Sequence, residues 1–395
     1  MQNFYLPKNK KAFMLHKKIF ALTLALSLAS IALQTHAAPG REDLVIGQVA
    51  PLTGTIAGTG NEYVAGGAAY FAHVNNNGGI YGRKIRVVLK DDAYKPDQTL
   101  ALTRQILAED KPLALFGFVG TGNVLALNKN RVLEDAGIAL LAPYTGAQDL
   151  RDPMNPQIFH IRASYADETA RMVEHLQSIG LRRFAVMYQD DPFGKSGLAG
   201  AESALKKLGM QAVASGAYDR AKPEEIDAAV AAIAPANPDA IIMVAVNRAS
   251  AAFIKKMRVQ GSKARLFSIS VVNFKELLKN AGEENARGIG ISQVMPFPYS
   301  TLAPVAREFQ SLMAKYQPDK VVSYASMESF IAAKILVEAI RRSGADPTRA
   351  KVISQLEKMN SYDVGGFKVS FSADNRVGSK FVEVTVIGRD GKLLR

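Results

Sequence analysis

The chain has 395 residues, a formal net charge of +13 at pH 7 and no cysteine. Without cysteine it can form no disulfide bond, no thiolate metal site and no lipid-modified N-terminal cysteine. Its basic residues occur in pairs such as Arg182-Arg183 and Lys206-Lys207 on the polar faces of predicted helices. Because they form no stripe with interleaved aromatics, we expect no nucleic-acid partner.

The N-terminus has the pattern of a secretory signal peptide. Residues 1–18 contain five lysines and no acidic residue, and the run Ile19–Leu33 that follows is almost wholly apolar. Thr35 and Ala37 then supply small residues at the positions that a signal peptidase recognises. The apolar run of about 15 residues is shorter than the roughly 20 that span a bilayer. We therefore expect a signal peptide over residues 1–37 and export to the periplasm.

Cleavage should leave Ala38 or Pro39 as the first residue of the exported protein. Thr35 and Ala37 suit the earlier cut, whereas His36 is a poor residue at the position recognised for the later one. N-terminal sequencing of the periplasmic protein measures this directly. Exported protein that still contained Lys17 would contradict export through this signal.

Residues 44–96 have the pattern of a βαβ unit. The apolar run Leu44–Ala50 predicts a strand, and apolar residues at helical spacing over Tyr63–Val74 predict a helix after a loop rich in Gly and Thr. The cluster Asn75–Gly82 favours turns, and Lys84–Leu89 resumes as a strand.

The rest of the chain continues the alternation of strands and helices, which indicates parallel sheets covered by helices. About 358 residues remain after cleavage, which is more than one hydrophobic core usually supports, so we expect two domains. The further predicted strands are Leu113–Val119, Ala139–Ala142, Phe184–Tyr188, Ala240–Val246, Leu266–Ser270 and Gly288–Val294.

Two proline-containing loops, Leu150–Ile158 and Met295–Pro298, separate these series and are predicted to cross between domains. The C-terminal part changes character after three helical patterns, because two alternating segments there predict strands, with a hairpin turn at Arg389–Lys392. The helical patterns are Val305–Tyr316, Tyr324–Arg342 and Ala350–Met359, and the strands are Gly366–Phe371 and Phe381–Ile387.

Several phrases resemble the leucine/isoleucine/valine-binding-protein family of bacterial solute-binding proteins. They include PLTG, NNNGGIYGRKI, DDAYKP, DAGIALLAP, YQDDPFGKSG, SYASMESFIAAKIL and VTVIGRDGKL. Each phrase is weak alone, but together they are specific and extend from about Asp43 to the end of the chain. The resemblance implies a type I periplasmic binding protein, an α/β fold of two Rossmann-like lobes with parallel sheets and a hinge of three crossings.

On this resemblance we expect lobe 1 to contain residues 42–161 plus 296–372, and lobe 2 to contain residues 162–295 plus 373–395. A small ligand would be trapped between the lobes, which would close about crossings near Arg162, Met295 and Ser372.

One side of a ligand site can be predicted from the residues themselves. After the strand Leu113–Val119 the chain enters a helix, so free backbone N–H groups lie at the carboxyl edge of a parallel sheet and favour an anion. The next strand ends at the same edge, where ligands of open α/β sheets bind. The resemblance implies that both segments hold the ligand's carboxylate. The alternative is that Thr121 only caps its helix and Tyr144 only packs. The candidate residues are Thr121, Gly122, Asn123, Tyr144, Thr145 and Gly146.

The other candidates are Thr59, in the loop after the first strand, and Phe193, Asn247 and Ser270 in the second lobe. Amino-acid binders of the resembling family place an acid after a strand of that lobe, where it pairs with the ligand's ammonium group. The matching segment here, residues 266–273, contains no acid.

Either another acid, such as Glu328 or Asp190, replaces the missing partner, or the ligand lacks an amino group. An ammonium group without a carboxylate would lose a charged hydrogen bond worth about 1.5–3 kcal/mol. We favour the second alternative, a hydroxy, oxo or aromatic carboxylate.

Enzyme motifs do not match. Phe193–Ser196 imitates the end of a P-loop, but position 189 is Gln where a glycine is required. Gly58-Thr59-Gly60 and Gly120-Thr121-Gly122 lack the third glycine of a dinucleotide fingerprint, and no nucleophile elbow is complete. We expect no enzymatic activity, no cofactor and no metal site.

The predicted function is that of a periplasmic solute-binding protein that acts as a monomer. It would capture a small carboxylate, either an amino acid or an acid without an amino group, and deliver it to an inner-membrane ABC permease. A ligand-sensing receptor that feeds a chemoreceptor or a sensor kinase needs the same cleft, so the sequence leaves this alternative open.

Overall fold

The computed structural model describes residues 1–3 and 42–395. Apart from residues 1–3, the predicted signal peptide and both candidate cleavage sites lie outside the described residues. No helix within the described ranges has both the length and the apolar character needed to cross a membrane. Residues 43–395 form two α/β lobes, each built on its own sheet.

The first lobe contains a parallel five-stranded sheet with the order β2-β1-β3-β4-β5. The order reverses beside β1, which pairs with both β2 and β3, and this switch point is where open α/β sheets bind ligands. The strands are β1 (Leu44–Ala50), β2 (Ile85–Asp91), β3 (Ala114–Phe116), β4 (Leu140–Leu141) and β5 (Ile158–Phe159).

The second lobe contains a seven-stranded sheet with the order β14-β13-β10-β9-β8-β6-β7. Its strands from β6 to β10 pair in parallel, whereas the C-terminal hairpin of β13 and β14 joins β10 antiparallel. The strands are β6 (Phe184–Gln189), β7 (Ala212–Tyr218), β8 (Ala240–Val244), β9 (Arg265–Ser268), β10 (Gly290–Gln293), β13 (Glu383–Ile387) and β14 (Leu393–Leu394).

Helices pack on both sheets, and three that come late in the chain return to the first lobe. The helices of the first lobe are α2 (Ala57–Asn76), α3 (Pro96–Glu109), α4 (Thr121–Lys129), α5 (Val132–Ala136), α12 (Pro304–Tyr316), α13 (Tyr324–Arg342) and α14 (Arg349–Glu357). The helices of the second lobe are α6 (Tyr165–Ser178), α7 (Pro192–Lys207), α8 (Asp227–Ile233), α9 (Asn247–Val259), α10 (Phe274–Ala281) and α11 (Glu283–Ala286).

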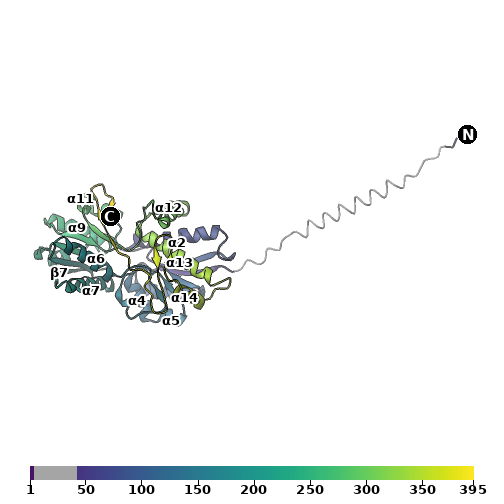
Figure 1. The fold of residues 1–395 in the computed structure, drawn as a ribbon, viewed down its shortest axis with the longest axis horizontal. Coiled ribbons are helices and arrows are strands. Elements are labelled where there is room, and N and C mark those ends of the chain that lie inside the picture. The colour runs from purple at the N-terminus through teal and green to yellow at the C-terminus, as the bar shows by residue number, and fades with distance from the viewer. Residues whose placement is uncertain (4–41) are drawn as a thin grey trace. The chain divides into compact units, whose positions relative to one another are not determined.

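Helix α13 packs against α2 and thereby joins the N-terminal and the late chain segments that make up the first lobe (Figure 1). A Cβ atom on Gly66 of α2 would lie 1.8 Å from the backbone oxygen of Ser326 in α13, so only glycine permits this approach. Helix α13 is buried on most of its surface, which is why the predicted helix Tyr324–Arg342 is apolar over so much of its length.

The last passage between the lobes comes later than the crossing predicted near Ser372. The backbone N–H of His160 donates to the carbonyl of Arg376 at 2.8 Å, and Gly378 donates back to His160 at 2.7 Å. These bonds hold residues 375–378 beside β5, so the chain leaves the first lobe after Gly378 and enters the second sheet at Glu383.

The strands differ from the sequence prediction in two places. The predicted strand Gly366–Phe371 is reduced to β12 (Lys368–Val369), which pairs only with β11 (Tyr362–Asp363). Strand β7 was not predicted, because its sequence AVASGAY is rich in small residues that carry little hydrophobic signal. It lies at an edge of its sheet, where one face does not need large apolar side chains.

Candidate functional site

Two adjacent cavities lie between the lobes at the carboxyl edge of the first sheet. The first, here called the helix-end cavity, has an empty volume of about 340 Å³ and is lined by the start of α4. The second, the Glu62 cavity, has an empty volume of about 330 Å³. Thr59, Tyr144 and Val271 line both cavities, so the two are neighbours with a common wall.

The helix-end cavity presents the N-terminus of α4 to its contents. Gly120, which precedes the helix, has φ of 107°, and a Cβ atom there would lie 2.6 Å from the Tyr94 ring. Glycine therefore brings the backbone close to the cavity. Thr121, the first residue of α4, contacts the Thr145 hydroxyl through its own hydroxyl at 2.6 Å. Free N–H groups and a hydroxyl at a helix N-terminus form a site for an anion.

Five of the ten predicted site residues line the two cavities. Thr121 and Phe193 line the helix-end cavity, and Ser270 lines the Glu62 cavity. Thr59 and Tyr144 line both. The cavities are thus bounded by both lobes, because Phe193 and Ser270 come from the second lobe.

The structure does not bring the other five predicted residues to the cavity walls. Thr145 lies behind Thr121, and Gly146 packs on Tyr165, whose ring would be 2.5 Å from an added Cβ atom. The remaining three are Gly122, which faces Arg220, Asn123, which is buried among other polar groups, and Asn247, which accepts a hydrogen bond from the backbone of Asn273.

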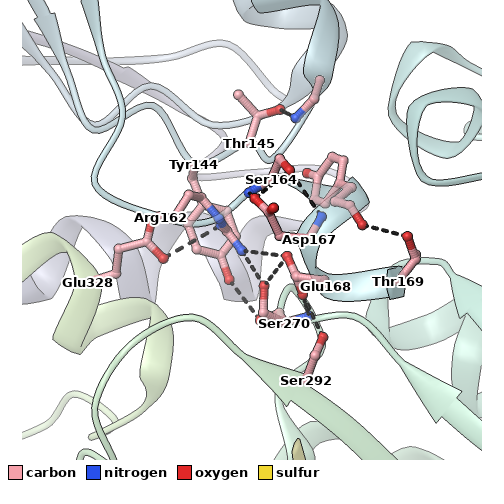
Figure 2. A network of polar contacts seen from close by, with 12 residues as sticks. Tyr144, Thr145, Arg162, Ser164, Asp167, Glu168, Thr169, Ser270, Ser292 and Glu328 are labelled. Atoms are coloured by element: carbon pink, nitrogen blue, oxygen red, sulfur yellow. Dashed lines mark hydrogen bonds and ion pairs between the residues drawn. The ribbon is translucent and has the colours of Figure 1, made fainter. Parts of the chain in front are cut away.

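A buried ionic network lies behind the cavity wall, at the first crossing between the lobes (Figure 2). The Arg162 guanidinium lies 3.5 Å from a Glu328 oxygen and 3.7 Å from a Glu168 oxygen, and none of the three side chains is more than 2% exposed. The guanidinium also donates to the Ser270 hydroxyl and lies 4.4 Å from the centre of the Tyr144 ring. Arg162 thereby supports two residues that line the cavities.

Glu168 is the better satisfied of the two acids. Its oxygens accept hydrogen bonds from the Ser270 backbone at 2.8 Å, the Ser270 hydroxyl at 3.0 Å and the Ser292 hydroxyl at 2.6 Å. Glu328 has one oxygen without a hydrogen-bond partner among the described residues. Glu168 therefore has the hydrogen bonds that stabilise a buried carboxylate, and Glu328 has fewer.

Burial raises the pKa of Glu328 to about 7, because the loss of solvation outweighs the attraction of the Arg162 guanidinium and adds to the repulsion from Glu168. Burial alone would lower the pKa of Arg162, but the charges around it, led by Glu328, raise it above its ordinary value. Arg162 therefore remains charged, while Glu328 exchanges a proton near neutral pH.

Glu328→Gln should change how stability depends on pH. The folded protein holds a proton on Glu328 between its ordinary pKa of 4.5 and about 7, where the unfolded chain has released it, so this group's stabilising contribution is lost as pH rises through that range. The glutamine side chain of the variant does not titrate, so the variant does not lose stability in this way. We expect the free energy of unfolding of the variant, relative to wild type, to rise by on the order of 3 kcal/mol between pH 4.5 and 7.5. Denaturant unfolding at both pH values measures it, and a constant difference would contradict it.

Arg220 of the second lobe contacts the first lobe beside the helix-end cavity. Its guanidinium lies 3.6 Å from the centre of the Tyr94 ring, donates to the Tyr94 carbonyl and donates to Asn123 Oδ1 at 2.9 Å. The same group pairs with Asp191 at 2.9 Å. Asp191 in turn caps α7 by accepting from the backbone of Phe193 and Gly194. Arg220 therefore connects a cavity wall of each lobe.

Glu62 of α2 places a carboxylate in the second cavity. Both of its oxygens accept from Asn273 Nδ2 of the other lobe, at 2.8 and 2.9 Å. Burial raises the pKa of Glu62, while hydrogen bonds from Ser323 and Asn273 act in the opposite direction. No ion pair joins Glu62 to a cation within the part of the chain that the structure describes.

Neither acid that the sequence suggested as a substitute lines a cavity. Glu328 lies behind Tyr144 in the ionic network, and Asp190 is exposed and paired with Lys195 at 3.0 Å. Glu62 was not considered, because the predicted helix began at Tyr63 whereas α2 begins at Ala57. A carboxylate therefore lines a cavity between the lobes, although residues 266–273 contain none.

Arg162, Glu168, Arg220 and Asn273 were also missed as parts of the site. A single charged residue within the apolar segment Ile158–Ala163 was the one available indication for Arg162. Among residues 1–3 and 42–395, no group of three or more His, Asp or Glu side chains could hold a metal ion.

Comparison with known proteins gives the family. The pattern that defines the periplasmic binding protein family matches residues 43–392. The chain belongs to this family. A substrate-binding periplasmic protein from Ralstonia solanacearum is 38% identical in sequence, and its crystal structure matches with a TM-score of 0.85 over 89% of this chain and 99% of that one.

Other proteins that are similar in sequence have names that refer to amino acids. The amino acid binding protein of Pseudomonas aeruginosa is 28% identical over 329 residues, which are 80% of this chain and 84% of that protein. The Leu/Ile/Val-binding protein homolog 7 of Brucella abortus is 24% identical over 388 residues, 94% of this chain and 95% of that protein. The predicted membership of the leucine/isoleucine/valine-binding-protein family is thereby confirmed, and so is the type I fold. Members of this family bind solutes, and membership implies a periplasmic location.

Proposed function

We propose that this periplasmic binding protein captures a small carboxylate between its two lobes and delivers it to an inner-membrane ABC permease. The observation that carries the proposal is the start of α4, where Gly120 and Thr121 line a cavity that Phe193 and Val246 of the other lobe close. Most of the residues that line the cavity are buried, and hydrogen bonds in such surroundings are stronger than in water. We propose no chemical reaction, because the residues that line the two cavities form a binding cradle and include no nucleophile paired with a base.

The chemistry of the helix-end cavity suits the two parts of a small organic acid. The backbone N–H groups and the Thr121 hydroxyl would bind the carboxylate, as helix N-termini bind anions. Tyr94, Tyr165 and Phe193 line the same cavity and would pack against the apolar part of the ligand. The names of the P. aeruginosa and B. abortus relatives support an amino acid or a related acid.

We further propose that ligand binding closes the lobes about three crossings. Lobe 1 would contain residues 42–161 and 296–378, and lobe 2 would contain residues 162–295 and 379–395. The contacts of His160 with residues 376 and 378 extend lobe 1 beyond the boundary at residue 372 that the sequence suggested. The three passages are then near Arg162, near Met295 and after Gly378. Hinge closure of this kind excludes water from a cleft.

Thr121→Val should weaken the binding of any carboxylate. The substitution keeps the size of the side chain and removes one hydroxyl from the cradle, which costs about 1.5–3 kcal/mol for a hydrogen bond to a charged group and therefore about 10–100-fold in affinity. Calorimetric titration with the tightest acid from a panel of valine, its hydroxy and oxo counterparts and benzoate measures the effect.

Thr103→Val is the matched control. Thr103 is equally buried, but its hydroxyl donates to the Thr99 carbonyl within α3 and lines neither cavity. The control should bind the acid as wild type does. Equal affinities for wild type and Thr121→Val would contradict the proposed cradle.

A further inference from the structure

The two cavities differ in chemistry. The Glu62 cavity is polar and contains a carboxylate, whereas the helix-end cavity suits an anion. Glu62, Asn273, Ser270 and Ser323 contribute polar groups to its wall, and Tyr324 contributes an aromatic ring. The carboxylate of Glu62 is half-buried and its nearest partners are neutral, Asn273 and Ser323. The positive charge of Lys275 lowers the pKa of Glu62 through space, but none of the ion pairs described above joins the two side chains. A bound cation would supply the direct counter-charge that this carboxylate lacks.

The two cavities offer separate sites for the negative and the positive group of one ligand. Thr121 lines one cavity and Glu62 the other, and the residues common to both walls are Thr59, Tyr144 and Val271. A ligand that reached both Thr121 and Glu62 would have to extend past the Tyr144 side chain. In an α-amino acid, one carbon separates the carboxylate from the ammonium group, so it is too short to place its charges in separate cavities.

We propose that the Glu62 cavity binds the ammonium group of an amino acid whose amino group lies several carbons from its carboxylate, with Glu62 as the residue that selects it. This inference rests on the proposed function, because the carboxylate end of the same molecule occupies the helix-end cavity. Glu62 would donate no proton; it accepts hydrogen bonds from the ammonium N–H groups. Tyr324 lines the same cavity, and its ring would contribute a cation–π contact to the ammonium group.

The contact between Glu62 and Asn273 could alternatively serve only to hold the lobes together, since the two residues belong to different lobes. The two roles of Glu62 differ in which ligands would lose affinity when Glu62 is changed. A contact between lobes affects every ligand that requires closure by the same factor. A partner for an ammonium group affects only ligands that carry one.

The test compares 4-aminobutanoate and 5-aminopentanoate with butanoate, pentanoate and 2-aminobutanoate, by calorimetric titration of wild type and Glu62→Gln. The amide introduced by this substitution keeps an oxygen on the side chain and loses the negative charge. We expect wild type to bind an ω-amino acid at least tenfold more tightly than either the acid without an amino group or 2-aminobutanoate. We expect Glu62→Gln to lose at least tenfold in affinity for the ω-amino acid and to change the affinity for the plain acid by less than threefold.

Glu276→Gln is the matched control, because Glu276 lies close enough to influence Glu62 electrostatically but lines neither cavity. The preference of Glu276→Gln for the ω-amino acid should stay within threefold of that of wild type, because the loss of a charge that acts only through space has a small effect. Two results would overturn the inference while leaving the proposed function in place: equal binding of ω-amino and plain acids by wild type, or equal losses for both in Glu62→Gln. Should no carboxylate of any class bind to wild type, the proposed function would fail, and this inference with it.

Discussion

Arg162→Met should lower the free energy of unfolding by about 3–5 kcal/mol, the usual cost of removing one partner from a buried ion pair. Methionine fills much of the space of the arginine stem, so the loss reflects charge more than volume. Without the guanidinium, the Glu168 carboxylate remains buried with hydrogen bonds but loses the cation that lies 3.7 Å away. The Ser270 hydroxyl and the Tyr144 ring also lose the group that supports them. Denaturant unfolding at pH 7.5 measures the change.

Arg248→Met is the control for charge and size. Arg248 pairs with Glu224 at 2.8 Å, but both side chains are at least half exposed, so its loss should cost less than about 1 kcal/mol. Adding Glu168→Gln to Arg162→Met should recover part of the stability, because it removes the uncompensated charge. A loss for Arg162→Met as small as that of the control would contradict the described role of the network.

Arg220→Met should weaken ligand binding about 10–100-fold while changing the stability of the ligand-free protein less. In this structure Arg220 bonds to the Tyr94 carbonyl and to Asn123 of the opposite lobe, and the loss of one charged hydrogen bond of this kind costs about 1.5–3 kcal/mol, or about 10–100-fold. An open arrangement would lack these bonds. Their removal therefore shifts the population away from the closed, binding-competent state, which reduces the apparent affinity.

Titration and small-angle scattering of the same samples separate the possible causes. Arg220→Met at saturating ligand should show the same compact scattering curve as wild type, but only at higher ligand concentration. Arg248→Met, in the same lobe, should bind as wild type does. If Arg220→Met bound the ligand with unchanged affinity, the contacts of Arg220 across the cleft would have no part in closure.

The sequence predicted the elements whose pattern is local. Strand β1 has the predicted bounds, Leu44–Ala50, because a continuous apolar run ends at a proline. Helix α13 also matches its prediction, since Ser323 caps it and apolar residues continue to its end. Strand β7 escaped prediction because small, alternately exposed residues give little contrast between the faces of an edge strand.

The residues of the candidate site likewise include some that the sequence could predict and others that it could not. Thr121 and Tyr144 could be found because each follows a buried strand at the edge where α/β sheets bind ligands. Glu62 could not, since its partner Asn273 is 211 residues away and only the fold brings them together. Arg162 and Ser270 are 108 residues apart for the same reason. Polar contacts of such separation have no signature in the order of residues.

Comparison of an acid with its own amide tests the central claim most directly. Thermal unfolding of the purified protein should be measured with each acid of the panel, including the ω-amino acids, and with its primary amide, which has nearly the same shape but no negative charge. Binding to the folded state alone raises stability by about 2.7 kcal/mol when free ligand is about 100 times the dissociation constant, so the melting temperature reports it. We predict that at least one acid raises the melting temperature and that its amide does not. Equal shifts for an acid and its amide, or shifts only with compounds that carry no carboxylate, would contradict the proposal that this protein captures carboxylates at the N-terminus of α4.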